Sequence, residues 1–314
     1  FMNNLTHKFA TETGFSSIRI QKLMDKSIFP EEKFENGKKE KIYKEAKYYH
    51  KAQKGLLRIS KYQFNHTAKL NRTCLSKHNI KILSVEQGYD YGLANNEEES
   101  PDTKIWHINF ASEKAFTEWG SESRSQEAAM IIEMPVLHNA SIFLEQNIQP
   151  TLRYKSKNQI WLPSPLLFEG VPQWVSLYSG KIKNITWDKT NNVISMMAPY
   201  GGQGLYSEKQ ILNLFLTLFA AFGGAIKRGK KDKTNKTEIH TGNWGCGNMR
   251  NNKELIYLSQ IYVASILGID QIIFHCIDQK LLNNAIEKWK AIPNNLSLIE
   301  AVELFTKYKY TWRD

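Results

Sequence analysis

The sequence is poor in cysteine, and this excludes two common ways of stabilising a fold. Only three cysteines occur among 314 residues, and they lie far apart. A disulfide framework needs paired cysteines, and a zinc knuckle needs closely spaced cysteine or histidine ligands. We therefore expect an apolar core, no metal, no cofactor and a reducing compartment.

Long apolar runs are also missing. No stretch of about 18 apolar residues occurs, which is the length that would suggest a membrane span. The chain also shows no charged leader followed by an apolar segment. We expect no membrane span and a cytoplasmic location. With 41% apolar and 23% charged residues, the composition is typical of a globular protein.

Acidic residues are fewer than basic ones, so the net charge is +11. Much of the excess lies in lysine clusters at 38–41 and 227–236, and the simplest interpretation is a solvated surface or loop. Attraction of an acidic, phosphate-bearing substrate is a second interpretation. Nucleic-acid binding is a third, but the sequence lacks aromatic residues interleaved on a basic stripe and any recognisable reading motif. We expect a monomer without a nucleic-acid partner.

The pattern of apolar residues divides the chain into two parts. Residues 2–76 are expected to form a helical accessory region, and residues 77–314 a larger domain. In the larger part, buried strands alternate with helices, which predicts an α/β sandwich. The expected strands are 81–85, 104–111, 270–276 and several short ones between 162 and 197. The expected helices are 126–135, 207–222, 281–289 and 296–308.

The most informative stretch is 241–250, which reads Thr-Gly-Asn-Trp-Gly-Cys-Gly-Asn-Met-Arg. Gly242, Gly245 and Gly247 let the backbone adopt positive φ or approach a ligand closely. Apolar residues at helical spacing follow, so we expect the loop to open a helix. Such a loop presents N–H groups and the positive end of the helix dipole to an anion such as a diphosphate. A tight surface turn anchored by Trp244 is the alternative.

This stretch closely resembles the Thr-Gly-Asn-Trp-Gly-Cys-Gly segment of poly(ADP-ribose) glycohydrolases, macrodomain enzymes that cleave ADP-ribose. The resemblance implies a three-layer α/β/α sandwich with a mixed sheet that binds ADP-ribose. Phe222 stands where the family stacks adenine, although a core phenylalanine is the alternative. The resemblance implies ligand contacts from Gly242, Asn243, Gly245, Cys246, Gly247, Asn248 and Met249.

A second region is similar to the same family. The family pattern has Asn/Asp-Phe-Ala, a triple glycine, Gln-Glu-Glu and then a proline. The residues in register with it are Asn109, Phe110, Ala111, Gln126, Glu127 and Pro135. By this resemblance Asn109, Phe110 and Gln126 contact the ligand. Two departures matter: bulky residues near Phe116 replace the triple glycine, and Ala128 replaces the catalytic acid.

Hydrolysis at the ribose anomeric carbon needs a carboxylate for proton transfer. Because Ala128 cannot transfer a proton, the candidates are Glu127, Glu118 and Glu122. The resulting hypothesis is an ADP-ribosylhydrolase that removes mono-ADP-ribose from protein, with an arginine linkage favoured. It would act in the cytoplasm, or as a bacterial effector in a host cytosol. The competing hypothesis is a module that binds ADP-ribose without turnover.

Overall fold

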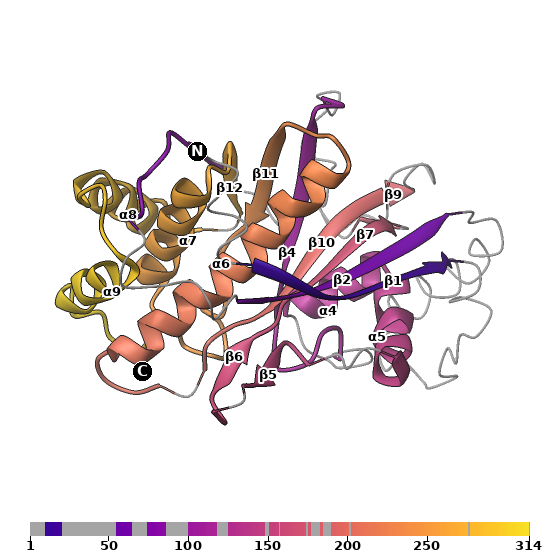
Figure 1. The fold of residues 1–314 in the computed structure, drawn as a ribbon, viewed down its shortest axis with the longest axis horizontal. Helices are drawn as coiled ribbons and strands as arrows, with labels where there is room; N and C mark the ends of the chain where they lie inside the picture. The colour runs from indigo at the N-terminus through magenta and orange to yellow at the C-terminus, as the bar shows by residue number, and fades with distance from the viewer. Residues whose placement is uncertain are drawn as a thin grey trace.

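One large sheet with helices on both faces organises the computed structural model (Figure 1). The structure describes residues 10–20, 55–64, 74–85, 100–117, 125–147, 151–156, 158–173, 175–176, 183–184, 190–200, 202–275 and 277–313.

The sheet has eight strands in the order β1-β2-β7-β10-β4-β11-β12-β3. Its centre and one edge are parallel, from β10 through β4, β11 and β12 to β3. The other strands attach antiparallel to one another and to β10. The strands are β1 (Ala10–Arg19), β2 (Leu56–Phe64), β3 (Lys81–Val85), β4 (Thr103–Ala111), β7 (Leu166–Pro172), β10 (Thr190–Met197), β11 (Lys236–Thr241) and β12 (Gln271–His275). Two small ribbons pair β5 (Arg153–Lys155) with β6 (Trp161–Pro163) and β8 (Val175–Ser176) with β9 (Lys183–Asn184).

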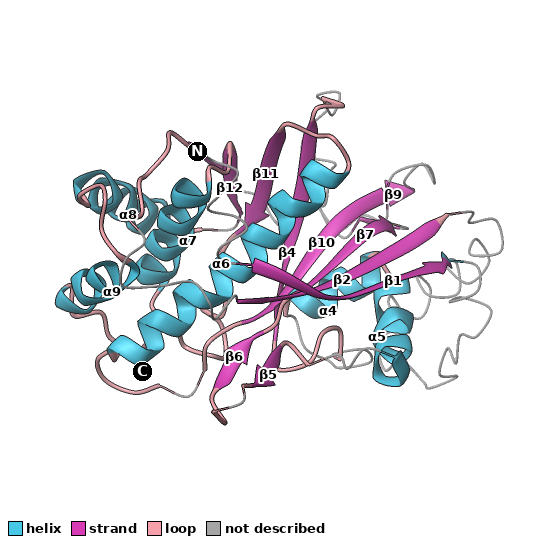
Figure 2. Ribbon diagram, in the orientation of Figure 1, coloured by secondary structure: helices cyan, strands magenta, loops and turns pink. Residues whose placement is uncertain are grey.

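Four helices form the layer on one face of the sheet: α6 runs diagonally across the strands, α7 packs beside it, α8 packs on α7 and α9 on α6 (Figure 2). They are α6 (Glu208–Lys231), α7 (Lys253–Leu267), α8 (Gln279–Ala291) and α9 (Leu298–Lys307). Ser207 and Gln210 form a capping box that fixes the start of α6. By length and composition α6 could span a membrane, but 78% of its apolar window is buried inside the molecule. It is therefore the central core helix of this layer.

Two helices cover the other face, α4 (Gln126–Glu133) and α5 (Val136–Asn147). Their apolar side chains form a second core with β2, β7 and β10, separate from the core beneath α6. Ser125 caps α4 by accepting a hydrogen bond from the Ala128 N–H. The helix ends just before Pro135, as predicted, because proline lacks the N–H that a helix interior requires. Together the layers confirm the predicted α/β/α sandwich with a mixed sheet.

Two predictions about secondary structure and one about a single residue are wrong. Residues 10–19 and 56–64 were expected to be helical but are strands of the main sheet. The expected boundary at 76–77 therefore separates strands of one sheet. Residues 21–54 lie outside the described part. The expected loop at 227–236 is the last part of α6, a short turn and the start of β11. Phe222 is fully buried in the core under α6, which contradicts its predicted contact with adenine.

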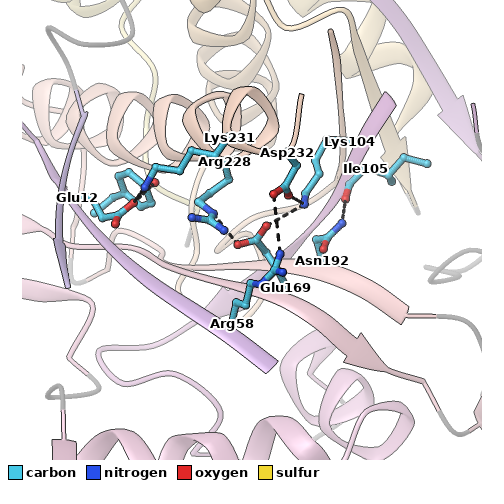
Figure 3. Close-up of polar contacts among 10 residues, drawn as sticks. Glu12, Arg58, Lys104, Ile105, Glu169, Asn192, Arg228, Lys231 and Asp232 are labelled. Atoms are coloured by element: carbon cyan, nitrogen blue, oxygen red, sulfur yellow. Dashed lines mark hydrogen bonds and ion pairs between the residues drawn. The ribbon is translucent and has the colours of Figure 1, made fainter. Parts of the chain in front are cut away.

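An ion-pair network joins the end of α6 to the sheet (Figure 3). Glu169 on β7 accepts from Arg228 Nε at 2.6 Å and from Lys104 Nζ at 2.8 Å, and all three side chains are largely buried. Lys104 also pairs with Asp232, which follows α6. Lys104 lies near the amino end of β4, so the network stabilises the end of the sheet opposite to the candidate site.

Candidate functional site

The candidate site lies where the carboxyl ends of the parallel strands meet. The loop at 242–250, here called the glycine loop, leaves β11 between its neighbours β4 and β12. A Cβ atom added to Gly242 would lie 2.7 Å from the His275 carbonyl oxygen and 3.6 Å from Phe110 Cζ. One added to Gly245 would lie 2.6 Å from Ala198 Cβ, just beyond β10. Ligands of open α/β sheets bind at this end of the strands.

Asn251 holds the second half of the glycine loop. Gly245 has a φ of 68°, a left-handed conformation that favours glycine. The buried Asn251 amide donates to the carbonyl oxygens of Gly245 at 2.9 Å and Pro199 at 2.7 Å. Its oxygen accepts from the Tyr206 hydroxyl at 3.0 Å. The loop is thus tied to the ends of two other segments, which fixes its shape before any ligand binds.

Residues of α7 hold the first half of the loop. The amide nitrogen of the buried Gln260 donates to the Gly242 carbonyl at 3.2 Å. The amide oxygen of Gln260 accepts from the Thr241 hydroxyl. The Tyr257 hydroxyl donates to Asn243 Oδ1. Trp244 is fully buried in the core, as the alternative interpretation of a core-anchored turn required. Anchoring by Trp244 leaves the rest of the loop available for a ligand.

Cys246 also belongs to the core. Its side chain is 3% exposed, its thiol donates to the Trp244 carbonyl, and its N–H donates to Asn243 O at 2.9 Å. Burial raises the pKa of the Cys246 thiol to about 12, although the charges of Arg313 and Lys253 act in the opposite direction. The thiol is therefore neutral and unsuited to nucleophilic attack. The Cys246 side chain therefore serves the core, and the ligand contact expected of this residue stays a prediction.

The tip of the glycine loop is open. Gly247 and Asn248 are exposed, and a Cβ at Gly247 would meet nothing within 4 Å. Among the described residues, no acceptor pairs with the N–H groups of Gly247, Asn248 or Met249. Helix α7 begins a few residues later, with Asn252 as its N-cap. Backbone donors and a helix N-terminus together suit an anion.

The second predicted region joins the site through α4. The Gln126 side chain accepts from the Phe110 N–H at 2.9 Å and donates to the Ile108 carbonyl at 3.0 Å. These bonds fasten the first turn of α4 to the carboxyl end of β4. Gln126 is thereby largely committed to the backbone, which gives its presence in the motif a structural reason.

Glu127 is fixed by two donors. Its Oε1 accepts from the Phe116 N–H at 2.7 Å and from Asn109 Nδ2 at 2.9 Å, and the residue is 1% exposed. Asn109 Nδ2 also donates to Ser195 Oγ of β10 at 3.0 Å. The geometry therefore brings Asn109, Glu127 and Ser195 together.

Phe116 lies in the hydrophobic core. Its ring is fully buried, packs edge-to-face on Phe168 at 5.1 Å and belongs to the core beneath α4 and α5. The bulky side chain at this position, where the family has a glycine, therefore packs into the core. Glu118 and Glu122 lie outside the described residues, so their positions stay predictions.

Glu113, which follows β4, forms an ion pair with Arg153. Its carboxylate accepts from Arg153 Nη2 at 2.6 Å, and Arg153 stacks over the Trp161 ring at 4.3 Å. The Leu152 N–H also donates to the Glu113 carbonyl at 2.8 Å. The β5–β6 ribbon thus braces the loop that leaves β4, and this pairing makes Glu113 a bracing residue.

Sequence reasoning missed several residues that shape the site: Asn251, Gln260 and Ser195. Gln260 could have been noticed as a polar residue within an apolar helix face. The others carry no local signal because their partners are distant in the sequence. For metals, the described residues contain no group of three or more His, Cys, Asp or Glu side chains able to hold an ion.

The fold is an α/β/α sandwich, and its glycine loop has backbone N–H groups and a helix N-terminus that suit an anion. Residues 181–284, which include the glycine loop, match the family model described as Poly (ADP-ribose) glycohydrolase (PARG), Macro domain fold. This match confirms the predicted resemblance to that macrodomain family. No curated protein sequence matches the chain.

Solved structures of bacterial poly(ADP-ribose) glycohydrolases are also similar. The enzyme from Thermomonospora curvata is 14% identical, with 68% of this chain and 79% of that chain covered and a TM-score of 0.45. The Deinococcus radiodurans enzyme in complex with ADP-ribose is 13% identical, with 68% and 86% covered and a TM-score of 0.44.

Proposed function

We propose that the chain binds ADP-ribose and hydrolyses its bond to a modified protein. The observation that carries the proposal is the convergence of two motifs at one end of the sheet. The glycine loop follows β11, and the Asn109–Glu127 pair stands at the end of the neighbouring β4. One motif would hold the diphosphate and the other the ribose, in the manner the family match suggests.

In this proposal Glu127 orients the ribose. A carboxylate held by the Phe116 N–H and the Asn109 amide keeps one orientation, which suits hydrogen bonding to ribose hydroxyls. Ala128 leaves the usual acid position without a proton donor. We assign proton transfer to Glu118 or Glu122, in the sequence between Thr117 and Ser125.

Mono-ADP-ribosylated protein is the proposed substrate, with arginine as the favoured linkage. The family's triple glycine and catalytic acid are both replaced here, the acid by Ala128. These replacements support removal of a single ADP-ribose unit from protein over cleavage of the poly(ADP-ribose) polymer. The location we propose is the cytoplasm, or a host cytosol if the chain is a bacterial effector.

The test is release of ADP-ribose from proteins modified on arginine, glutamate or serine. Wild type is compared with Glu118→Gln, Glu122→Gln and Glu127→Gln, and ADP-ribose affinity is measured for each. Loss of the general acid or base should reduce turnover by roughly 10²- to 10⁴-fold while affinity stays near that of wild type. The Glu127→Gln variant should weaken both.

A binding module without turnover is the second candidate, favoured by Ala128. It replaces the hydrolase if wild type binds ADP-ribose tightly but releases none from any of the three substrates. Rapid release from purified polymer would contradict the preference for a single unit.

A further inference from the structure

Residues 310–313, the last that the structure describes and here called the C-terminal arm, pack against the glycine loop. Thr311 forms an antiparallel bridge with Leu205, and the Trp312 N–H donates to the Gly204 carbonyl at 2.8 Å. The Trp312 ring stacks on Tyr206 with centroids 4.4 Å apart and planes 10° from parallel. A Cβ at Gly202 would overlap the same indole. The arm is therefore firmly seated.

The arm also contacts the glycine loop directly. The Arg313 N–H donates to the Arg250 carbonyl at 2.9 Å, and Arg313 Nη2 reaches the Gly247 carbonyl at 3.5 Å. Asn252, the N-cap of α7, donates to the Thr311 carbonyl at 3.1 Å. These bonds place the Arg313 guanidinium beside the open tip of the loop, where Gly247 is exposed.

The guanidinium has donors to spare. A guanidinium carries five N–H groups, and within the described part of the chain this one makes a single weak bond, to the Gly247 carbonyl. Among the described residues, no carboxylate forms an ion pair with Arg313, Arg250 or Lys253. The three cations therefore come from the arm, the glycine loop and the first residue of α7, and the exposed N–H groups of the loop lack acceptors in the described part of the chain. Such a cluster repels itself unless an anion is present.

We propose that Arg313 is a ligand-binding residue that contacts the diphosphate of ADP-ribose from the C-terminal arm. This inference rests on the proposed function and adds a residue that no motif assigns. A planar guanidinium can hold phosphate oxygens through two parallel bonds, which an ammonium cannot. The seat formed by Tyr206 and Trp312 keeps the arm in place, so the cation is positioned before the ligand arrives.

The experiment measures ADP-ribose affinity by calorimetry for wild type, Arg313→Gln and Arg313→Lys. The matched control is Lys307→Ala, which removes an exposed cation from α9. Arg313→Gln should weaken binding by roughly ten- to a hundredfold, as expected for hydrogen bonds to a charged group. Arg313→Lys should restore part of the loss, and Lys307→Ala should bind as wild type does.

Salt separates an electrostatic role from a structural one. As salt rises, the affinities of wild type and Arg313→Gln should converge, because screening weakens the charge contribution of Arg313. Equal affinities at low salt, or a loss that lysine does not relieve and salt does not change, would overturn the role of Arg313. Failure of wild type itself to bind ADP-ribose would overturn the proposed function and this inference together. Thermal unfolding checks that each variant folds.

Discussion

At the scale of single residues, the three glycines of the loop have different tasks. Gly245 needs its left-handed φ of 68° and has no room for a Cβ, since Ala198 and Asn251 lie 2.6 and 2.7 Å from that position. Gly247 has open space around it. We expect Gly245→Ala to destabilise the fold by roughly 1–3 kcal/mol, while Gly247→Leu leaves stability unchanged.

Ligand binding should show the complementary pattern. A leucine at position 247 would project from the open tip and obstruct the diphosphate, so its ADP-ribose affinity should fall sharply. Urea unfolding and calorimetry on both variants check this pair of outcomes. Wild-type affinity in a folded Gly247→Leu variant would contradict the assignment of the loop to the ligand.

Asn251 provides a second test at this scale. Its loss leaves the Gly245 carbonyl, the buried Pro199 carbonyl and the Tyr206 hydroxyl without this partner. We expect Asn251→Ala to cost about 1–3 kcal/mol of stability and to weaken ADP-ribose binding, because the loop loses its fixed shape. Asn248→Ala, at the exposed tip, is the control for stability. An Asn251→Ala variant as stable as wild type would contradict the anchoring role.

Residue types with a strong local requirement were predictable, and residues defined by distant partners were not. The loop glycines and the Glu127 register could be recognised because their chemistry depends on adjacent residues. Phe116 and Phe222 could not be placed, since an aromatic ring serves a core and a ligand site equally well. Only the packing against Phe168 and the burial under α6 distinguish these uses.

At the scale of elements, the ion-pair network predicts where a charge change matters. Glu169 is 3% exposed and holds two cations, Arg228 and Lys104. Removing one partner of a buried pair typically costs about 3–5 kcal/mol, so Glu169→Gln should strongly lower the free energy of unfolding. The exposed pair Glu287–Lys290 offers a control, and Glu287→Gln should cost less than about 1 kcal/mol.

ADP-ribose affinity should survive in folded Glu169→Gln protein. The network lies at the amino end of β4, whereas the glycine loop follows the carboxyl end of β11. Urea unfolding measures the loss of stability in Glu169→Gln and in Glu287→Gln. Equal losses would show that burial of the ion pair does not decide how much its removal costs.

Helices with a wide apolar face were predicted well, and the first two strands were not. Residues 2–76 were expected to be helical, although Ile18 and Ile20 are two residues apart, which is the period of a strand. In β1 exposed and less exposed positions alternate along the strand, as its place at the sheet edge requires. Propensity alone could not reveal this, because pairing with β2 and contact with α6 decide the conformation.

At the scale of the whole molecule, the alternation of strands and helices was enough to predict the sandwich. The strand order was not predictable, because neighbours such as β12 and β3 are far apart in sequence. The site was hard to predict for the same reason, since segments far apart in the sequence contribute to it. What could be predicted was that the glycine loop opens a helix, and α7 confirms it.

Acid should destabilise the whole molecule through two buried histidines. Burial lowers the pKa of His275 to about 3, and the nearby charge of His240 acts in the same direction. Burial also lowers the pKa of His138, although a hydrogen bond to the Phe116 backbone opposes this. His240 Nδ1 lies 2.9 Å from His275 Nε2, and Glu238 bonds to His240 at 2.6 Å. The folded state therefore favours neutral His275.

The direction of the pH effect follows from these shifts. Above about pH 6.5 both states hold the two histidines neutral, so their contribution to stability is fully present. Below that pH the unfolded chain binds protons that the folded protein excludes, and stability falls as pH decreases toward 3. Each excluded proton costs about 1.4 kcal/mol per pH unit.

Urea unfolding between pH 5 and 7 measures this slope with little contribution from Asp and Glu, whose side chains ordinarily titrate at lower pH. Wild type should lose stability across the interval, and His275→Asn should lose less because one excluded proton is gone. The half-exposed His78 supplies the matched control, since His78→Asn should keep the wild-type slope. A slope that is the same in all three proteins would show that burial of His275 does not set the acid sensitivity.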